Sequence, residues 1–187
     1  MRKILVLFTM IVLVTASIEA LTTIGAPQEI HPADAMWIEP DEIDLSELPV
    51  GYKFNVTVWV NSSIATYSWQ FRINFNTTYF NALKAGYTAG TTSEFFQGLL
   101  TIPVEPQIDN DVGYVLYGET LLGAAQRDPG YGSLAWIEFE VISKPAQTET
   151  VITKLDFSAD LTFLMDPTLN RVQVNTYSCE IKWIGIL

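Results

Sequence analysis

Few residues of this chain have the type and spacing that enzyme chemistry requires. The sequence holds one histidine, His31, and one cysteine, Cys179. A single histidine outside the predicted strands excludes a triad built on a core histidine and a histidine-based zinc site. The chain also lacks a G-x-S-x-G motif and a glycine-rich phosphate-binding loop. The sequence therefore predicts a protein that is not an enzyme and has no catalytic residue, cofactor or metal site of its own.

Two acidic features bear on that prediction. A glycosidase needs two carboxylates across a cleft, and Glu119 is the one carboxylate inside an apolar strand. We interpret Glu119 as a residue at a strand edge or bulge that faces water. The segment Asp109–Asp111 resembles the start of a calcium loop, but Gly113 and Thr120 stand where an EF-hand needs its fifth and twelfth ligands. A turn is the favoured interpretation.

Other residues are suited to recognition at a surface. Trp59 and Trp136 fall on strand faces that we predict to point outward, and two coplanar exposed indoles could stack on sugar rings. The alternative is that a loop covers them. Three N-x-S/T sequons make Asn55, Asn61 and Asn76 possible N-glycosylation sites if the chain is secreted.

The N-terminal residues predict export. Arg2 and Lys3 precede the apolar run Ile4–Val14, which is shorter than the roughly 20 residues of a membrane span. Small residues follow, so residues 1–20 fit a secretory signal peptide that is cleaved after Ala20, with a retained anchor as the alternative. We therefore expect a secreted protein, extracellular or on the cell surface, without a membrane span after cleavage.

Composition narrows the class of partner. The 187 residues suit one domain, and the formal net charge of −11 argues against nucleic-acid binding. Residues 21–34 contain prolines and no periodicity, so we predict a leader or tether there and a domain over 35–187.

Cys179 alternates with Ile181 and Trp183, which indicates a small buried hydrophobic residue. The alternative is a free reactive thiol.

Two alternating runs between Val50 and Phe75 organise the domain. The first, VGYKFNVTVWV, and the second, TYSWQFRINF, place apolar and polar residues at a strict period of two. This period predicts half-buried strands with one apolar face. Trp69, Trp183 and Trp37 are expected in the interior. The polar face of the second run consists of Ser68, Gln70, Arg72 and Asn74.

The rest of the domain reads as short strands separated by turns. Phe80–Ala85 could be a strand or one helical turn, and residues 86–106 are predicted to be irregular. Gly118 indicates a bulge or a close backbone approach. With about eight to ten strands and no sustained helical period, the chain predicts an all-β sandwich. The remaining predicted strands are Ala35–Glu39, Ile43–Leu45, Tyr114–Leu122, Leu134–Val141, Val151–Phe157, Leu161–Met165 and Arg171–Ile184.

Four segments, in this order and spacing, resemble the cohesin domain family in the style of the cohesin-like domains of archaeal secreted proteins. They are PVGYKFNVTVWVNSSIATYSWQFRINFNTTYF, IDNDVGYVLYGETLLG, GYGSLAWIEFEVISKP and LMDPTLNRV. The resemblance spans residues 35–184. It implies a nine-stranded jelly-roll β-sandwich, related in fold to carbohydrate-binding modules. It also implies a non-catalytic role in which one sheet face binds a calcium-loaded dockerin module.

In bacterial cohesins the strand that matches Tyr67–Phe75 presents an Asn and an Asp to the dockerin, and Ser68 and Gln70 stand at those positions here. The resemblance places the partner surface on Ser68, Gln70, Arg72 and Asn74.

We expect a secreted monomeric module that docks a dockerin-bearing partner in extracellular polysaccharide degradation or cell-surface assembly. Any calcium is expected on the partner rather than on this chain. One alternative is a polysaccharide-binding module that uses Trp59 or Trp136. A second alternative is a structural subunit of a surface layer or filament.

Overall fold

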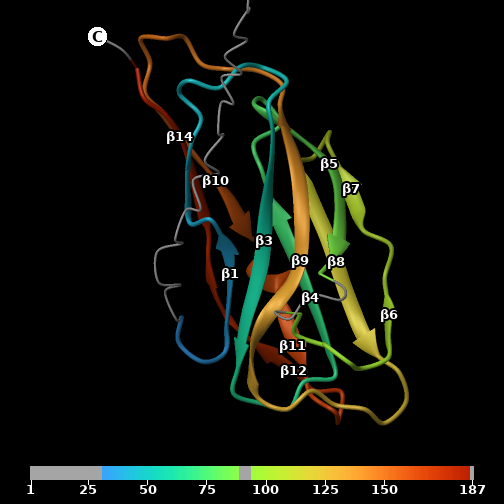
Figure 1. Cartoon of the computed structure of the whole chain (residues 1–187). Helices are drawn as coiled ribbons and strands as arrows, with labels where there is room; N and C mark the ends of the chain where they lie inside the picture. Colours follow the sequence, from blue (N-terminus) through green and yellow to red (C-terminus); the bar gives the residue numbers. More distant parts are fainter. Residues whose placement is uncertain (1–30, 89–93, 186–187) are drawn as a thin grey trace, which may run out of the picture. The chain divides into compact units, whose positions relative to one another are not determined.

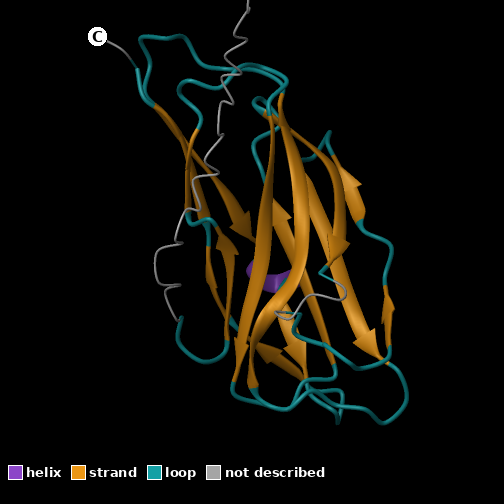
Figure 2. Cartoon of the chain, viewed as in Figure 1, coloured by secondary structure: helices purple, strands orange, loops and turns teal. Residues whose placement is uncertain are grey.

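The computed structural model describes residues 31–88 and 94–185, where nearly all regular structure is β-strand (Figures 1 and 2). Fourteen strands and one short 3₁₀ helix, Ala159–Leu161, follow one another along these residues. The predicted signal peptide and residues 21–30 of the predicted leader lie outside them. Within the described ranges no helix is long and apolar enough to cross a membrane. The predicted all-β class is confirmed.

One sheet has five strands in the order β13-β1-β3-β9-β5. All neighbours are antiparallel except β1 and β13, which run parallel. In Figure 1 most of this sheet lies in front, with β3 and β9 at its centre. The strands are β1 (Ala35–Glu39), β3 (Lys53–Ser62), β5 (Phe80–Tyr87), β9 (Gly130–Val141) and β13 (Asn175–Tyr177).

The other sheet has nine strands and is centred on β4 (Ser68–Asn74). β8 pairs with β4 along one side, and β11 and β10 share its other side. β6 and β7 pair with the far side of β8, and β10 continues through β14 to β2. The remaining bounds are β2 (Glu42–Asp44), β6 (Thr101–Pro103), β7 (Gln107–Asp109), β8 (Tyr114–Leu121), β10 (Val151–Phe157), β11 (Phe163–Met165), β12 (Arg171–Gln173) and β14 (Cys179–Trp183).

The core fills the space between the sheets and follows from the alternation of β3 and β4. Both strands bury every second residue, as the sequence predicted. The rings of Trp69 and Phe71 lie parallel within 2° with centroids 5.7 Å apart. Tyr117 of β8 meets both rings edge-on. These offset and edge-to-face geometries are the favourable ones for aromatic pairs, so the aromatic residues fix how β4 and β8 sit over the core.

Trp37 is only 3% exposed, yet it lies outside the main core cluster, on the outer face of the five-stranded sheet. Its neighbours in register are Tyr177 on β13 and Trp59 on β3. The His31 ring lies 4.7 Å from the Trp37 ring and 4.4 Å from the Tyr177 ring. The Asn61 side chain donates a hydrogen bond to the His31 carbonyl at 2.9 Å. His31 is thereby held against the sheet, where it covers Trp37.

A side chain from the β7–β8 turn links the two sheets. β5 shifts its register against β9 between Ala82 and Lys84, so the ladder is irregular there. The Asn110 amide fills the gap: Oδ1 accepts from the Ala82 N–H at 2.8 Å, and Nδ2 donates to the Ala82 carbonyl at 3.1 Å. The Asp109 carboxylate accepts from the Asp111 N–H within the same segment. The predicted turn at Asp109–Asp111 is confirmed.

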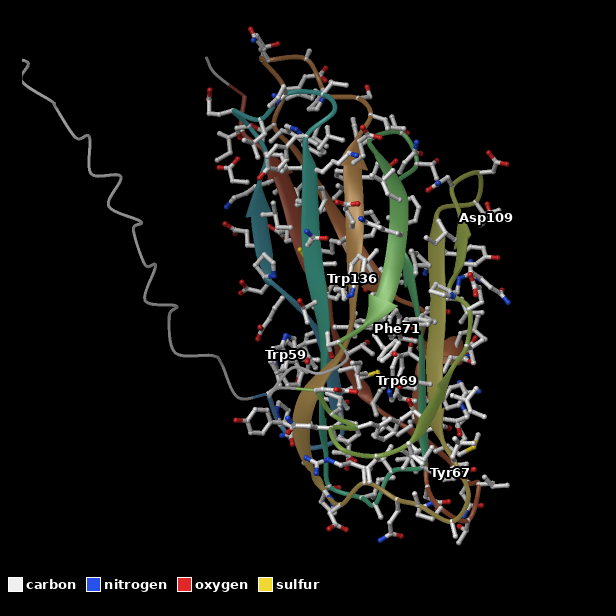
Figure 3. All side chains as sticks on the ribbon, turned by 45° about the vertical axis from the view of Figure 1, so that its right-hand side comes forward. Trp59, Tyr67, Trp69, Phe71, Asp109 and Trp136 are labelled. Atoms are coloured by element: carbon white, nitrogen blue, oxygen red, sulfur yellow. The ribbon has the colours of Figure 1, made fainter. Side chains whose placement is uncertain are left out.

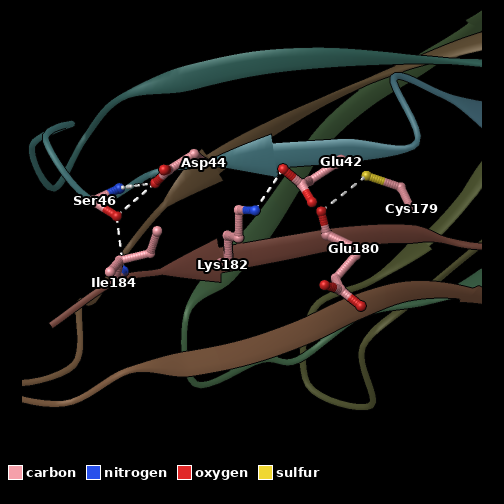
Figure 4. A network of polar contacts seen from close by, with 7 residues as sticks. All are labelled: Glu42, Asp44, Ser46, Cys179, Glu180, Lys182 and Ile184. Atoms are coloured by element: carbon pink, nitrogen blue, oxygen red, sulfur yellow. Dashed lines mark hydrogen bonds and ion pairs between the residues drawn. The ribbon is translucent and has the colours of Figure 1, made fainter.

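The final strand joins the N-terminal part of the domain through polar contacts (Figure 4). β14 runs parallel to β2, and the Lys182 ammonium lies 2.5 Å from a Glu42 carboxylate oxygen. Ser46 follows β2; its N–H donates to the Asp44 carboxylate, and its hydroxyl accepts from the Ile184 N–H at 2.8 Å. These contacts hold β2, the edge strand of the nine-stranded sheet, against β14.

Eight of the fourteen strands have five residues or more and six have three. The long strands are those that the sequence predicted. Phe80–Tyr87 is a strand rather than a helical turn, and the segment predicted to be irregular contains β6. The expected final segment Arg171–Ile184 divides into three strands because β12 and β14 belong to one sheet and β13 to the other.

Candidate partner-binding face

The predicted contact residues lie together on the outer face of β4. Ser68, Gln70, Arg72 and Asn74 are all half-buried and alternate with core residues of the same strand. Figure 3 marks the core side of this strand by Trp69 and Phe71. The structure therefore brings the four side chains into one row.

Three of these four side chains take part in hydrogen bonds. Gln70 Nε2 donates to the carbonyl of Leu161 at 3.1 Å. Arg72 Nε donates to the Asn74 side chain at 3.0 Å, and its guanidinium carbon lies 4.1 Å from the centre of the Tyr114 ring. Side chains that are already ordered lose less entropy when a partner binds. The row is thus a pre-organised polar surface.

Apolar and aromatic side chains flank the row on the same face. Leu116 of β8 stands opposite Arg72, and Phe163 of β11 stands opposite Gln70. Arg171 of β12 places its guanidinium carbon 4.1 Å from the centre of the Phe163 ring. We call the outward side chains of β4, β8 and β11 the β4 face: Ser68, Gln70, Arg72, Asn74, Tyr114, Leu116, Thr120, Phe163 and Met165.

A shallow hollow of about 120 Å³ opens in this face over Gly118. Gln70, Val104 and Leu116 are among the residues that line it. A Cβ on Gly118 would lie 2.8 Å from the Trp69 carbonyl oxygen, so only glycine fits between the strands. The close backbone approach predicted at Gly118 is confirmed, and it leaves a hollow that could take an apolar side chain of a partner.

An apolar strip borders the hollow. Every second residue along β6 and its two ends is apolar and exposed. These residues are Leu100, Ile102 and Val104, which are 76%, 50% and 54% exposed. Val104 N–H donates to the Gly118 carbonyl, and Leu122 N–H donates to the Leu100 carbonyl. We call Leu100, Ile102 and Val104 the β6 strip. The sequence analysis did not identify this strip, Leu116 or Phe163 as surface residues that a partner could contact. The available signal was an apolar residue on each face of the same strand, as at Leu116 of β8 and Phe163 of β11, because an apolar outer face indicates a covered or binding surface.

Trp59 and Trp136 lie on the outer face of the opposite, five-stranded sheet (Figure 3). Both are half-buried. Trp59 stacks on Trp37 with a 15° angle between the rings and centroids 6.3 Å apart. The Trp136 indole lies against Gly86, with the Lys84 ammonium 5.8 Å from its ring centre. Each indole therefore already packs against its own sheet, and sugar stacking on them stays a prediction.

The three sequon asparagines differ in their surroundings. Asn55 is exposed on the outer face of β3. The Asn61 amide nitrogen, to which a glycan would attach, donates its hydrogen bond to His31. The Asn76 side-chain oxygen accepts from the Thr78 N–H. Glycosylation stays a prediction, and of the three sites Asn55 has the most accessible side chain.

The expectation for Glu119 was wrong. Glu119 does not face water: it is 3% exposed and lies on the inner side of β8 opposite Trp69. Burial raises the pKa of this carboxyl above its usual range, the nearby Glu94 adds to the rise, and hydrogen bonds from Thr101 and Trp69 oppose it. The alternation of β8 continues without a break through Gly118, so Glu119 points inward on the same face as Val115, Tyr117 and Leu121.

No group of three or more His, Cys, Asp or Glu side chains in the described ranges is placed to hold a metal ion. His31 and Cys179 lie in different surroundings. His31 packs in the aromatic stack, and Cys179 belongs to the core.

Cys179 should be chemically inert in the native protein. It is fully buried, and burial together with nearby acidic groups raises the pKa of its thiol to about 12. Because the thiolate is the reactive species, we expect a thiol-alkylating reagent at mildly alkaline pH to react at least about a hundredfold more slowly with native than with denaturant-unfolded protein. Mass spectrometry of the time course measures both rates on the same single thiol. Equal rates would show that the thiol is accessible.

Solved structures share this fold. A non-cellulosomal cohesin from the archaeon Archaeoglobus fulgidus superposes with a TM-score of 0.58 at 15% identity, over 82% of this chain and 93% of that one. The cohesin of a type I cohesin–dockerin complex from Clostridium thermocellum superposes with a TM-score of 0.60 at 9% identity, over 84% of this chain and 99% of that one. The sixth cohesin of scaffoldin B of Acetivibrio cellulolyticus was solved with a Cel5 dockerin. It superposes with a TM-score of 0.56 at 13% identity, over 82% of this chain and 100% of that one.

No protein-family model matches the sequence, and a search of curated proteins finds no match either. The class is therefore defined by the fold: a two-sheet β-sandwich of the jelly-roll type. Within that class, the described residues have the fold of cohesin modules, and the resemblance stated from the sequence is confirmed at the level of the fold.

Proposed function

We propose that this chain is a secreted, non-catalytic binding module that docks a dockerin-bearing partner on the β4 face. The observation that carries the proposal is the make-up of that face. The polar row of β4 borders a hollow with mixed apolar and polar lining, and Arg72 and Arg171 each lie over an aromatic ring. Arginine and aromatic residues are enriched in protein interfaces and often act as their energetic anchors.

The structural neighbours support this class of partner. Several of them are cohesins that were solved in complexes with dockerins. We further propose that the complex serves extracellular polysaccharide degradation or cell-surface assembly, with this chain as a monomer. Its calcium would belong to the dockerin, because EF-hand-like loops supply the oxygen ligands that calcium requires.

Capture of partners from the secreted proteins of the source organism tests the proposal. The bait is the chain from residue 21, used once with calcium and once with a chelator. We expect calcium-dependent capture of proteins whose sequences contain dockerin modules, since such modules lose their fold without metal. Capture of polysaccharide alone would support the carbohydrate-binding alternative, and calcium-independent capture would contradict the dockerin assignment.

Changing Leu116 to arginine should weaken capture. The long charged side chain would fill the hollow that we propose the partner enters, so we expect a loss of at least about thirtyfold in affinity, which corresponds to about 2 kcal/mol. The double variant Gln70→Ala/Arg72→Ala should also lose capture, because it removes the anchors beside the hollow. Isothermal titration with the captured dockerin measures each affinity.

Thr57→Arg is the matched control, since it places the same charge on the outer face of the five-stranded sheet. It should leave the affinity unchanged. Equal binding by Leu116→Arg and Thr57→Arg would show that the partner does not use the β4 face. Circular dichroism confirms that each variant is folded before it is titrated.

A further inference from the structure

Glu119 is a buried acid at the point where β6 meets the rest of the nine-stranded sheet. Its side chain lies inside the sandwich, and its Oε1 atom has no hydrogen-bond partner in the described part of the chain. Pro103 of β6 stands opposite Glu119 in the β6–β8 ladder, and the Thr101 side chain donates a hydrogen bond to the carboxyl. The acid therefore contacts the strand that carries the β6 strip.

The surroundings favour the neutral acid over the carboxylate. Burial favours the neutral acid, and Glu94 adds a like charge from the segment before the Phe95 ring. Tyr117 lies beside Glu119 on β8. Trp69 on β4 and Thr101 on β6 donate hydrogen bonds that favour the carboxylate, but the net shift of the pKa is upward. Arg127 lies over the Phe95 ring, and neither it nor any lysine is among the groups that shift the pKa of Glu119. An ionised Glu119 would thus be a buried charge without a cation, which is costly.

β6 has little else to hold it in place. It pairs with β8 over three residues, and on the described residues it has no second strand beside it. Val104 is attached through one backbone hydrogen bond to Gly118, and Leu100 accepts one from Leu122. The segment is short and its apolar side chains are exposed, which are features of the parts of a protein that open locally at low cost.

We propose that Glu119 is a proton-dependent latch: the protonated acid holds β6 on β8, and ionisation releases β6 together with its apolar strip. The pH dependence of the latch follows from the upward shift of the Glu119 pKa. A carboxyl whose pKa is raised in the folded state contributes its full stability below the ordinary glutamate pKa, and that contribution disappears as the pH rises through the folded-state value. The latch is closed in acid and open toward alkaline pH.

Hydrogen exchange of the β6 amides tests the latch on the whole chain. After correction for intrinsic exchange, protection of the Ile102 and Val104 amides, which face β8, should fall by at least about tenfold between about pH 5 and about pH 9. In Glu119→Gln, which stays neutral, protection should be independent of pH. Glu149→Gln, at an exposed glutamate, should behave like the parent protein.

Two outcomes would overturn the latch: constant protection in the parent protein, or the same pH dependence in Glu119→Gln. If the glutamine variant does not fold, Glu119→Met replaces it as a neutral side chain of similar length. Trp69 lies beside the acid, so the tryptophan fluorescence of the parent protein should change over the same pH range. In either variant this change should be absent.

The consequence for the partner rests on the proposed function, because the β6 strip borders the proposed docking face. Capture should weaken from about pH 5 to about pH 9 in the parent protein and stay constant in Glu119→Gln. pH-dependent exchange with pH-independent capture would leave the latch intact and remove the β6 strip from the docking surface. Constant exchange would remove the latch and leave the docking face untouched.

Discussion

Replacing Trp69 with alanine should lower the free energy of unfolding by about 3–5 kcal/mol, the largest loss that we expect from a single substitution. Its indole is fully buried, lies parallel to the Phe71 ring and meets Tyr117 edge-on. It also supplies a hydrogen bond to Glu119. The substitution would therefore open a cavity between β4 and β8 and leave the buried acid with one partner fewer. Denaturant unfolding followed by circular dichroism measures the change.

Trp136→Ala is the matched control for that measurement. It removes the same side chain from a half-buried position on the outer face of the five-stranded sheet, where solvent can fill the space. We expect a loss of about 1 kcal/mol, as for most substitutions outside a core. If the two alanine variants were equally stable, the aromatic packing between β4 and β8 would not be what holds the sandwich together.

Replacing Asn110 with alanine should cost about 2–4 kcal/mol, although Asn110 itself is an exposed turn residue. Its amide satisfies both backbone groups of Ala82, a buried residue at the register shift of β5. Without the amide, a donor and an acceptor lose their partners at once, each at about 1–3 kcal/mol. Chemical denaturation measures the loss, and hydrogen exchange at the Ala82 amide should rise with it.

The neighbouring turn residue provides the comparison. Asp111→Ala changes an exposed side chain of the same turn and should alter stability by no more than about 0.5 kcal/mol. Asn110→Asp keeps one acceptor but turns a carboxylate toward the Ala82 carbonyl, so it should be nearly as damaging as alanine. A stable Asn110→Asp variant would mean that the donor half of the contact contributes little.

The alternation of residues determined much of this protein without any knowledge of its tertiary structure. The period of two in Lys53–Ser62 and Ser68–Asn74 predicted which side chains are buried, because a pleated strand has only two faces. The same alternation predicted that Ser68, Gln70, Arg72 and Asn74 share one face. Turn residues at Asp109–Asp111 predicted the turn that follows β7. These are local properties, and local geometry fixes them.

The tertiary structure alone decided features that depend on residues far apart in the chain. The alternation of β8 places Glu119 on the same face as Val115, Tyr117 and Leu121, but the closure of that face over the acid required β4, β6 and β8 to meet around it. The β4 face required Leu116 and Phe163 to be brought beside Gln70 and Arg72 by strand pairing.

The aromatic stack over Trp37 is the same kind of feature. His31 and Tyr177 stand at opposite ends of the described chain, and a parallel pairing of β1 with β13 brings them together. Alternation tells which residues share a face of one strand, but it carries no information about which strands lie side by side. That pairing is set by the packing of the whole core, and for this reason the strands could be predicted from the sequence while the composition of the β4 face could not.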